Sequence, residues 1–180
     1  FDDTLLGTDG TNFEDFRGEA GNDVINGRVG SNDRADYLTS SAAVTVDLGS
    51  GTAADGFGGT DTLSGIERVR GADFNDVLIG DANANTLQSG LGQDRLVGAG
   101  GDDKLIGNIA RGLSSSDFNA ADYSAATAGI NVVLSAEGTV TGDASVGTDT
   151  LIGIDRIFGS AFADTFLADD QQNGNFNRFN

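Results

Sequence analysis

The chemistry available to this chain rests on oxygen atoms. Its 180 residues include 28 acidic ones, of which 24 are Asp and 4 are Glu, while His and Cys are both absent. No imidazole or thiol can therefore ligate a metal or act as a nucleophile or base. Carboxylates, amides, hydroxyls and backbone carbonyls remain. These oxygen donors suit calcium or magnesium rather than zinc, copper or iron.

The net charge narrows the range of partners. The formal charge is -18, with only 10 basic residues, and these are scattered along the chain. This balance excludes nucleic acid and anionic membranes as expected partners. No apolar run approaches the roughly 18 residues of a membrane span. With a hydrophobic content of 38%, such an acidic chain should collapse only when something neutralises its charge.

The acidic residues recur with a period of nine residues between Gly71 and Ile106. The four consecutive blocks read GADFNDVLI, GDANANTLQ, SGLGQDRLV and GAGGDDKLI. Position six of the blocks holds Asp76, Asn85, Asp94 and Asp103, and position eight holds Leu78, Leu87, Leu96 and Leu105. The same spacing occurs at Gly18 (GEAGNDVIN) and Gly56 (GFGGTDTLS), and in weaker form at Gly159 (GSAFADTFL).

Each block is predicted to form one turn and one short strand. Gly, or Asn at Asn83, tolerates the positive φ of a tight turn. The triplet around the large apolar residue alternates outward, inward and outward, as in a strand. Two blocks then make one coil of a flattened solenoid, and stacked coils align the Leu side chains in a thin core. Blocks n and n+2 share an edge, so Asp76 should lie beside Asp94, and Asn85 beside Asp103.

A longer repeat is superimposed on the nonapeptides. Residues 35–48 match 121–134, and residues 60–81 match 148–169. We therefore divide the single repeat region 1–180 into a first unit (1–73), a second unit (74–161) and the start of a third (162–180). Because both ends fall inside a repeat unit, we expect these residues to be a slice of a longer array or its terminal copy.

Each long unit contains one departure from the nine-residue spacing. The segments AVTVDL (43–48) and INVVLS (130–135) are predicted to be apolar β-strands, and GTAADG and GTVTGD to be turn-rich returns after them. Asp36–Tyr37 and Asp122–Tyr123 occupy equivalent places in the two units. The favoured interpretation of these pairs is packing, with Tyr covering the end of the small core, and the alternative is a role in ligand binding.

The nonapeptide pattern resembles the repeats-in-toxin (RTX, haemolysin-type) family, whose repeat is G-G-x-G-x-D-x-U-x with U a large apolar residue. The best matching blocks are GAGGDDKLI, SGLGQDRLV, GEAGNDVIN and GFGGTDTLS. The resemblance implies an all-β fold, a right-handed parallel β-roll or β-solenoid, interrupted here by short β insertions. It also implies calcium ions held between turns on the same edge, and export by a type I secretion system.

The resemblance transfers a set of calcium ligands to matching positions. Several calcium ions are expected, each between two stacked turns and held by carboxylates and backbone carbonyls. The predicted ligands are Asp23, Asp61, Asp76, Asn85, Gly92, Asp94, Gly101, Asp103, Asp149 and Asp164. Some blocks depart from the pattern: Glu14, Asn85 and Asn177 stand at position six, and Phe74 and Phe162 at position four. Sites that depend on those positions are expected to be weak or empty. The stretch 107–117 breaks the nonapeptide spacing and is expected to end one roll segment.

Three functions can be weighed on these features. The favoured one is a non-enzymatic structural or interaction module of a large secreted or cell-surface bacterial protein, of the adhesin, surface-layer or matrix type. It would fold on binding calcium outside the cell, and its partners would be other copies or extracellular surface components. The second is an accessory module of a secreted protease, lipase or alginate epimerase. A carbohydrate-active site is disfavoured, since the carboxylates recur at one structural position rather than in a unique constellation.

Overall fold

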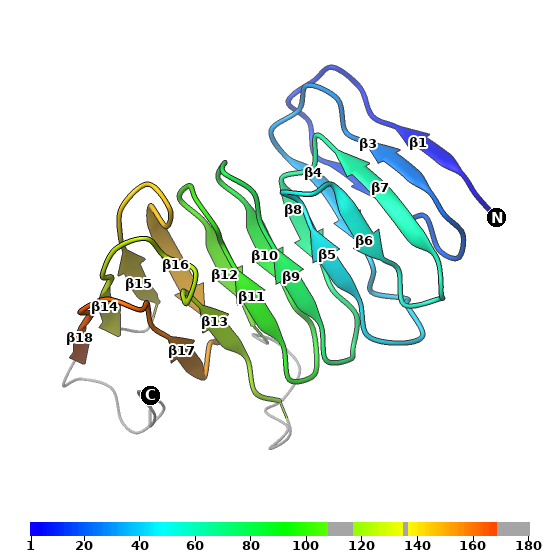
Figure 1. Ribbon diagram of the computed structural model, residues 1–180. Helices are drawn as coiled ribbons and strands as arrows, with labels where there is room; N and C mark the ends of the chain where they lie inside the picture. Colours follow the sequence, from blue (N-terminus) through cyan, green and yellow to red (C-terminus); the bar gives the residue numbers. More distant parts are fainter. Residues whose placement is uncertain (108–116, 135–136, 169–180) are drawn as a thin grey trace.

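A computed structural model describes residues 1–107, 117–134 and 137–168 (Figure 1). These residues form β-strands and contain no helix, which confirms the all-β prediction. The strands are β1 (Thr4–Leu6), β2 (Glu14–Phe16), β3 (Val24–Asn26), β4 (Asp33–Asp36), β5 (Thr45–Asp47), β6 (Thr52–Ala54), β7 (Thr60–Ser64), β8 (Arg68–Arg70), β9 (Val77–Ile79), β10 (Thr86–Gln88), β11 (Arg95–Val97), β12 (Lys104–Ile106), β13 (Ala120–Asp122), β14 (Asn131–Leu134), β15 (Gly138–Thr141), β16 (Thr148–Ile152), β17 (Arg156–Phe158) and β18 (Thr165–Ala168).

The described strands stack in two sheets of nine. One sheet, here called sheet A, has the order β1-β3-β7-β6-β5-β9-β11-β13-β17, and the other, sheet B, has the order β18-β14-β15-β16-β12-β10-β8-β4-β2. From β8 to β12 consecutive strands alternate between the sheets, and each pairs in parallel with the strand two blocks away. Leu78 accordingly pairs with Leu96, and Leu87 with Leu105. Two nonapeptides thus make one coil, as the spacing predicts.

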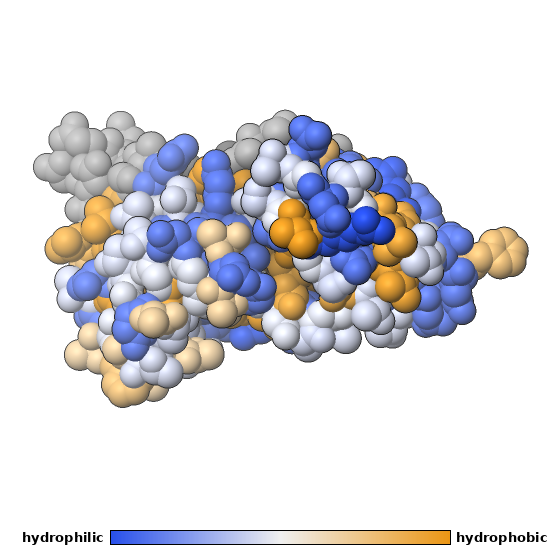
Figure 2. Space-filling model, turned by 90° about the horizontal axis from the view of Figure 1, so that it is seen from above, coloured by the Kyte–Doolittle hydropathy of each residue, from blue (hydrophilic) through white to orange (hydrophobic). Residues whose placement is uncertain are grey.

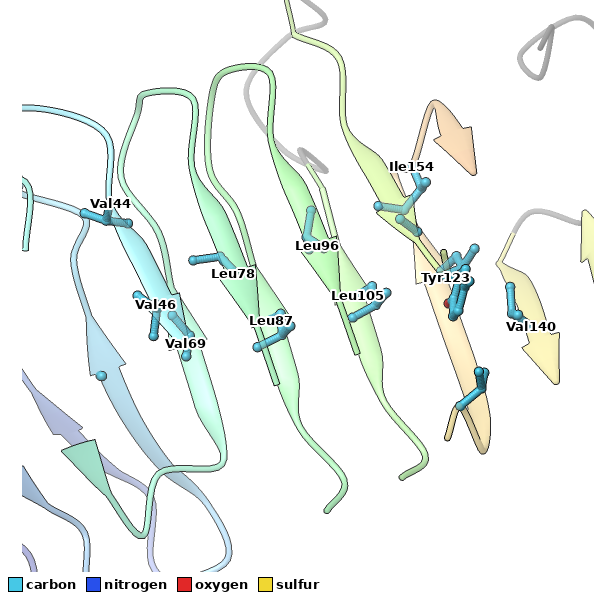
Figure 3. Close-up of a cluster of buried hydrophobic side chains, with 14 of the residues drawn as sticks. Val44, Val46, Val69, Leu78, Leu87, Leu96, Leu105, Tyr123, Val140 and Ile154 are labelled. Atoms are coloured by element: carbon cyan, nitrogen blue, oxygen red, sulfur yellow. The ribbon is translucent and has the colours of Figure 1, made fainter. Parts of the chain in front are cut away.

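The core is a thin layer of single apolar side chains between the two sheets. Leu78, Leu87, Leu96 and Leu105 are all 0% exposed and lie in one shared interior (Figure 3). Strands of three residues suffice here, since only the middle side chain faces inward while its neighbours face solvent. The outer surface seen in Figure 2 is mainly hydrophilic, with separate apolar patches.

Each long unit inserts a three-stranded antiparallel segment, which we call a meander. In the first meander β6 pairs antiparallel with both β5 and β7, and in the second β15 pairs antiparallel with both β14 and β16. Strands β5 and β14 confirm the strands predicted within 43–48 and 130–135, of which residue 135 lies outside the described part of the chain. The prediction that the following segments are only turn-rich returns was wrong, because β6 and β15 lie within them. Ala53 and Val140 are buried at their centres, and this burial favours strand over turn.

Equivalent strands of the two long units lie in opposite sheets. The first meander belongs to sheet A and the second to sheet B, and β4 and its counterpart β13 are likewise exchanged. Equivalent strands of the two units are nine apart along the chain, as β4 and β13 are. Because strands alternate between sheets except within a meander, this spacing places each strand of the second unit in the opposite sheet from its counterpart in the first unit.

Some predicted features fall outside the part of the chain that the structure describes. They include Asn177 and most of the break in the nonapeptide spacing at 107–117. Within the described ranges no helix has the length and apolarity needed to cross a bilayer.

Shortening one core leucine is expected to weaken the stack measurably. Leu87 is fully buried between β8 and β12, so Leu87→Ala leaves a cavity that neighbouring coils cannot fill. We expect the free energy of unfolding in saturating calcium to fall by about 2–5 kcal/mol. Urea unfolding followed by circular dichroism measures this, with the outward-facing Gln88→Ala as control. Equal effects of the two substitutions would contradict the shared interior.

Candidate calcium sites

The position-six side chains collect at the two edges where strands begin. We call the starts of the sheet A strands edge A, which includes Asp23, Asp61, Asp76 and Asp94, and the starts of the sheet B strands edge B. Edge B includes Asp33, Asn85, Asp103 and Asp149. Residues two blocks apart share an edge, as expected, because the coils stack in register. All eight of these side chains are buried, with exposed fractions of 0–3%.

A repeated hydrogen bond joins the coils along both edges. The backbone N–H of one position-six residue donates to a carboxylate oxygen, Oδ1, of the position-six residue in the following coil. We call this series the carboxylate ladder. Its bonds are Asp3 to Asp23 (2.7 Å), Asp23 to Asp61 (3.0 Å), Asp76 to Asp94 (2.9 Å), Asn85 to Asp103 (2.8 Å) and Asp103 to Asp149 (3.0 Å). One oxygen of each acceptor is thereby committed to the backbone.

The second carboxylate oxygen has no partner at several of these positions. Oδ2 of Asp23 and Oδ2 of Asp103 are buried without a hydrogen bond, and both oxygens of Asp33 are in the same state. A buried charge without a partner costs several kcal/mol, so such groups bind a proton or a cation. These oxygens are the strongest sign of a cation in the described structure.

Burial raises the pKa of several edge carboxyls. Desolvation is the largest cause at each, followed by opposing backbone hydrogen bonds and by repulsion from neighbouring carboxylates. The pKa of Asp103 rises to about 8, that of Asp76 to about 7, and those of Asp94 and Asp149 to about 6. The pKa of Asp61 is also raised. Ionisation of these edge carboxyls is therefore unfavourable unless a cation is bound beside them.

The glycine turns bring backbone carbonyls close to the carboxylates. Gly92 (φ 131°) and Gly101 (φ 111°) adopt conformations that other residues rarely take. A Cβ at Gly101 would lie 2.6 Å from the carbonyl oxygen of Asn83 in the neighbouring coil. At Gly98 a Cβ would contact Oδ2 of Asp103 and lie 3.1 Å from Oδ2 of Asp149. The space between stacked turns is thus lined by oxygen atoms and closed to larger side chains.

This donor set fits calcium, provided that carbonyls complete it. Calcium takes six to eight oxygens at about 2.3–2.6 Å, including backbone carbonyls. Among the described residues no group of three acidic side chains converges as a metal site. Any ion must therefore combine one or two carboxylates with carbonyls of stacked turns.

Comparison with protein families decides the assignment. The model for the RTX calcium-binding nonapeptide repeat matches four copies, over residues 1–33, 70–105 and 143–173. The chain belongs to this RTX family. No curated protein matches it. The RTX repeats identify a calcium-binding module of a secreted bacterial protein. Residues 34–69 and 106–142 fall outside the family match, and they hold the first meander and most of the second.

Three of the predicted RTX ligands accept local backbone amides. Asp76 accepts the amide of Val44 on Oδ1 (2.8 Å) and that of Ala72 on Oδ2 (2.6 Å). Asp164 is only partly buried, and its carboxylate accepts hydrogen bonds from the amides of Ile130 and Ser160, both at 2.9 Å. Asn85 accepts the Asp81 amide through Oδ1 at 2.7 Å, which leaves its buried Nδ2 without a partner. Because Nδ2 is a hydrogen-bond donor, it cannot ligate a cation, and the weak or empty site at Asn85 stays a prediction. Asn83 was expected to tolerate a positive φ but does not adopt one, and its amide donates to Asp81 Oδ1 (2.8 Å).

The sequence reasoning missed two buried acids. Asp33 lies on edge B. It is the seventh residue of its block (GRVGSND) rather than the sixth, so a strict nine-residue search does not find it. Asp55 lies between β6 and β7, where its Oδ1 accepts the amides of Phe57, Gly58 and Gly59 at 2.8–2.9 Å. Its Oδ2 is buried and unpartnered. The available signal was an Asp next to a Gly-containing turn, at the end of the turn for Asp33 and at its start for Asp55.

Both tyrosines contact position-six carboxylates. Tyr37 and Tyr123 are buried in the core, as the packing interpretation predicts. Their hydroxyls donate to Oδ2 of Asp61 (3.0 Å) and Oδ2 of Asp149 (2.9 Å). Burial, with the adjacent carboxylates next in size, raises the pKa of both tyrosines, so the hydroxyls keep their protons.

Acidification should stabilise the fold when calcium is removed. The folded-state pKa values of Asp103 (about 8) and Asp76 (about 7) exceed the roughly 3.9 of an unfolded Asp. The folded chain therefore binds more protons than the unfolded chain between about pH 4 and pH 8. Consequently the free energy of unfolding falls as the pH rises through this window. Circular dichroism in a chelator at several pH values measures the folded fraction and checks this, and a folded fraction that rises with pH would contradict it.

Proposed function

We propose that this chain is a non-enzymatic structural or interaction module of a secreted or cell-surface bacterial protein, and that calcium drives its folding outside the cell. The observation that carries this proposal is the set of buried, unpartnered carboxylate oxygens at Asp23, Asp33 and Asp103. They lie beside Gly-rich turns whose carbonyls face the same spaces. A divalent cation there would satisfy oxygens that the protein itself leaves without partners.

Electrostatics supports coupling of calcium binding to folding. The chain carries a net charge of -18, and the stacked turns bring carboxylates of successive coils to one edge. Without cations these groups repel or must take up protons, which opposes folding. The free energy of metal binding then becomes free energy of folding. Extracellular calcium modules have dissociation constants of about 10⁻⁴–10⁻³ M, so low cytosolic calcium would leave the chain unfolded until export.

The distribution of acids supports a structural role over catalysis. The carboxylates repeat at one position of each coil and are tied into the ladder by backbone amides. A catalytic centre needs a unique arrangement of groups around a substrate. Here the acids recur at the start of successive strands, as suits a stack of metal-binding turns. The outer faces of the sheets remain for contact with other copies or with extracellular surface components.

Calcium should induce the fold, and Asp103 should contribute to that effect. We expect β-sheet circular dichroism to appear on titration with calcium at about 10⁻⁴–10⁻³ M. Magnesium should not replace calcium, since it demands a smaller octahedral shell. Asp103→Asn removes the unpartnered oxygen and should reduce the rise in melting temperature that calcium gives, with fewer ions bound.

The matched control for this substitution is Asp102→Asn. Asp102 is exposed, and its Oδ1 accepts the Thr148 amide (2.9 Å), a role that an Asn oxygen can also fill. This variant should keep the wild-type response to calcium. A wild-type chain that folds fully in a chelator and binds no calcium would refute the proposal.

A further inference from the structure

Asp61 and Asp149 each lie at the end of a run of the carboxylate ladder. Beyond Asp61 in sheet A the next strand is the antiparallel β6, where Ala53 is its register partner. Beyond Asp149 in sheet B the next strand is the antiparallel β15, with Val140 in register. An antiparallel strand runs the wrong way to begin at this edge. The turn that follows it, 55–59 after β6 or 142–147 after β15, leads straight into β7 or β16, so no further parallel coil stacks on these two carboxylates.

The ladder offers two matched comparisons. Asp23 and Asp61 are successive members on edge A, and each accepts the preceding amide through Oδ1. Oδ2 of Asp23 is unpartnered, whereas Oδ2 of Asp61 accepts the Tyr37 hydroxyl. On edge B, Asp103 and Asp149 repeat the contrast. Oδ2 of Asp103 is unpartnered, and Oδ2 of Asp149 accepts the Tyr123 hydroxyl.

The two tyrosines reach these carboxylates in the same way. Each follows a strand of the opposite sheet, β4 or β13, and donates its amide to a neighbouring strand: Tyr37 to the Arg70 carbonyl (2.8 Å) and Tyr123 to the Phe158 carbonyl (2.9 Å). Both rings are buried, at 5% and 4% exposure. The coincidence of tyrosine, terminal carboxylate and antiparallel strand in two units on opposite sheets indicates one shared role.

We propose that the hydroxyls of Tyr37 and Tyr123 take the place of a cation at the ends of the ladder runs, so that Asp61 and Asp149 bind no calcium of their own. This inference rests on the proposed function, since it divides the predicted ligands into two classes. Asp23 and Asp103 depend on calcium for their second oxygen. Asp61 and Asp149 are satisfied by tyrosine and backbone donors of the protein itself.

Counting bound calcium in single variants tests this division. The full chain is saturated with calcium, and bound ions per folded molecule are measured by equilibrium dialysis with elemental analysis. Asp61→Asn and Asp149→Asn should retain the wild-type number of ions. Asp23→Asn and Asp103→Asn, the same chemical change one ladder step away, should each lose at least one ion. Loss of an ion in either of the first two, or no loss in both of the second two, overturns the inference.

If an Asp variant does not fold, the variants Tyr37→Phe and Tyr123→Phe provide a second test of the inference. Removing a hydroxyl leaves Oδ2 of Asp61 or Asp149 without its donor, so the melting temperature should fall while the number of bound ions stays equal or rises by one. A lower number would show that the tyrosine supports a calcium site, and would overturn the inference. A wild-type chain that binds no calcium marks failure of the proposed function itself, and the inference falls with it.

Discussion

The structure depends on one hydrogen bond, repeated from coil to coil, between a backbone amide and the carboxylate of the next position-six residue. It fixes the register of the coils at their edges, where the strands are too short to do so alone. It also draws acidic groups out of water. Because one oxygen is committed to this bond, the other needs a partner of its own. That partner is a backbone amide at Asp76, a tyrosine hydroxyl at Asp61, and a cation or a proton where the protein supplies neither. The proposed role of calcium is therefore a consequence of how the coils are joined.

Much of the fold could be predicted from the sequence because the nonapeptide specifies both a turn and an inward side chain. The leucines at position eight fixed the core and the alternation between sheets. The meanders were harder to predict. Their middle strands β6 and β15 contain small or polar residues that also suit turns, and only the burial of Ala53 and Val140 between neighbouring strands distinguishes them.

The edge on which each position-six residue lies could be predicted from the sequence, but the partner of its second carboxylate oxygen could not. The nine-residue period placed Asp76, Asp94 and Asp103 on the correct edges, yet it treated every position-six residue as equivalent. Whether the second oxygen has a partner depends on residues distant in sequence, such as Tyr37 for Asp61. Asp33 was overlooked because its turn is one residue longer, although its place at the start of a strand is the same. Distant contacts and turn length therefore decide the chemistry.

The exchange of the two meanders between sheets has a geometric consequence for recognition. Since an odd number of strands separates equivalent points, successive units are related approximately by a half-turn about the long axis. A surface feature formed by the first meander therefore has its counterpart on the opposite flank of the solenoid, and not further along the same flank. A rigid receptor that approaches one flank would therefore contact one of the two described meanders, and a second receptor could bind the other meander on the opposite flank.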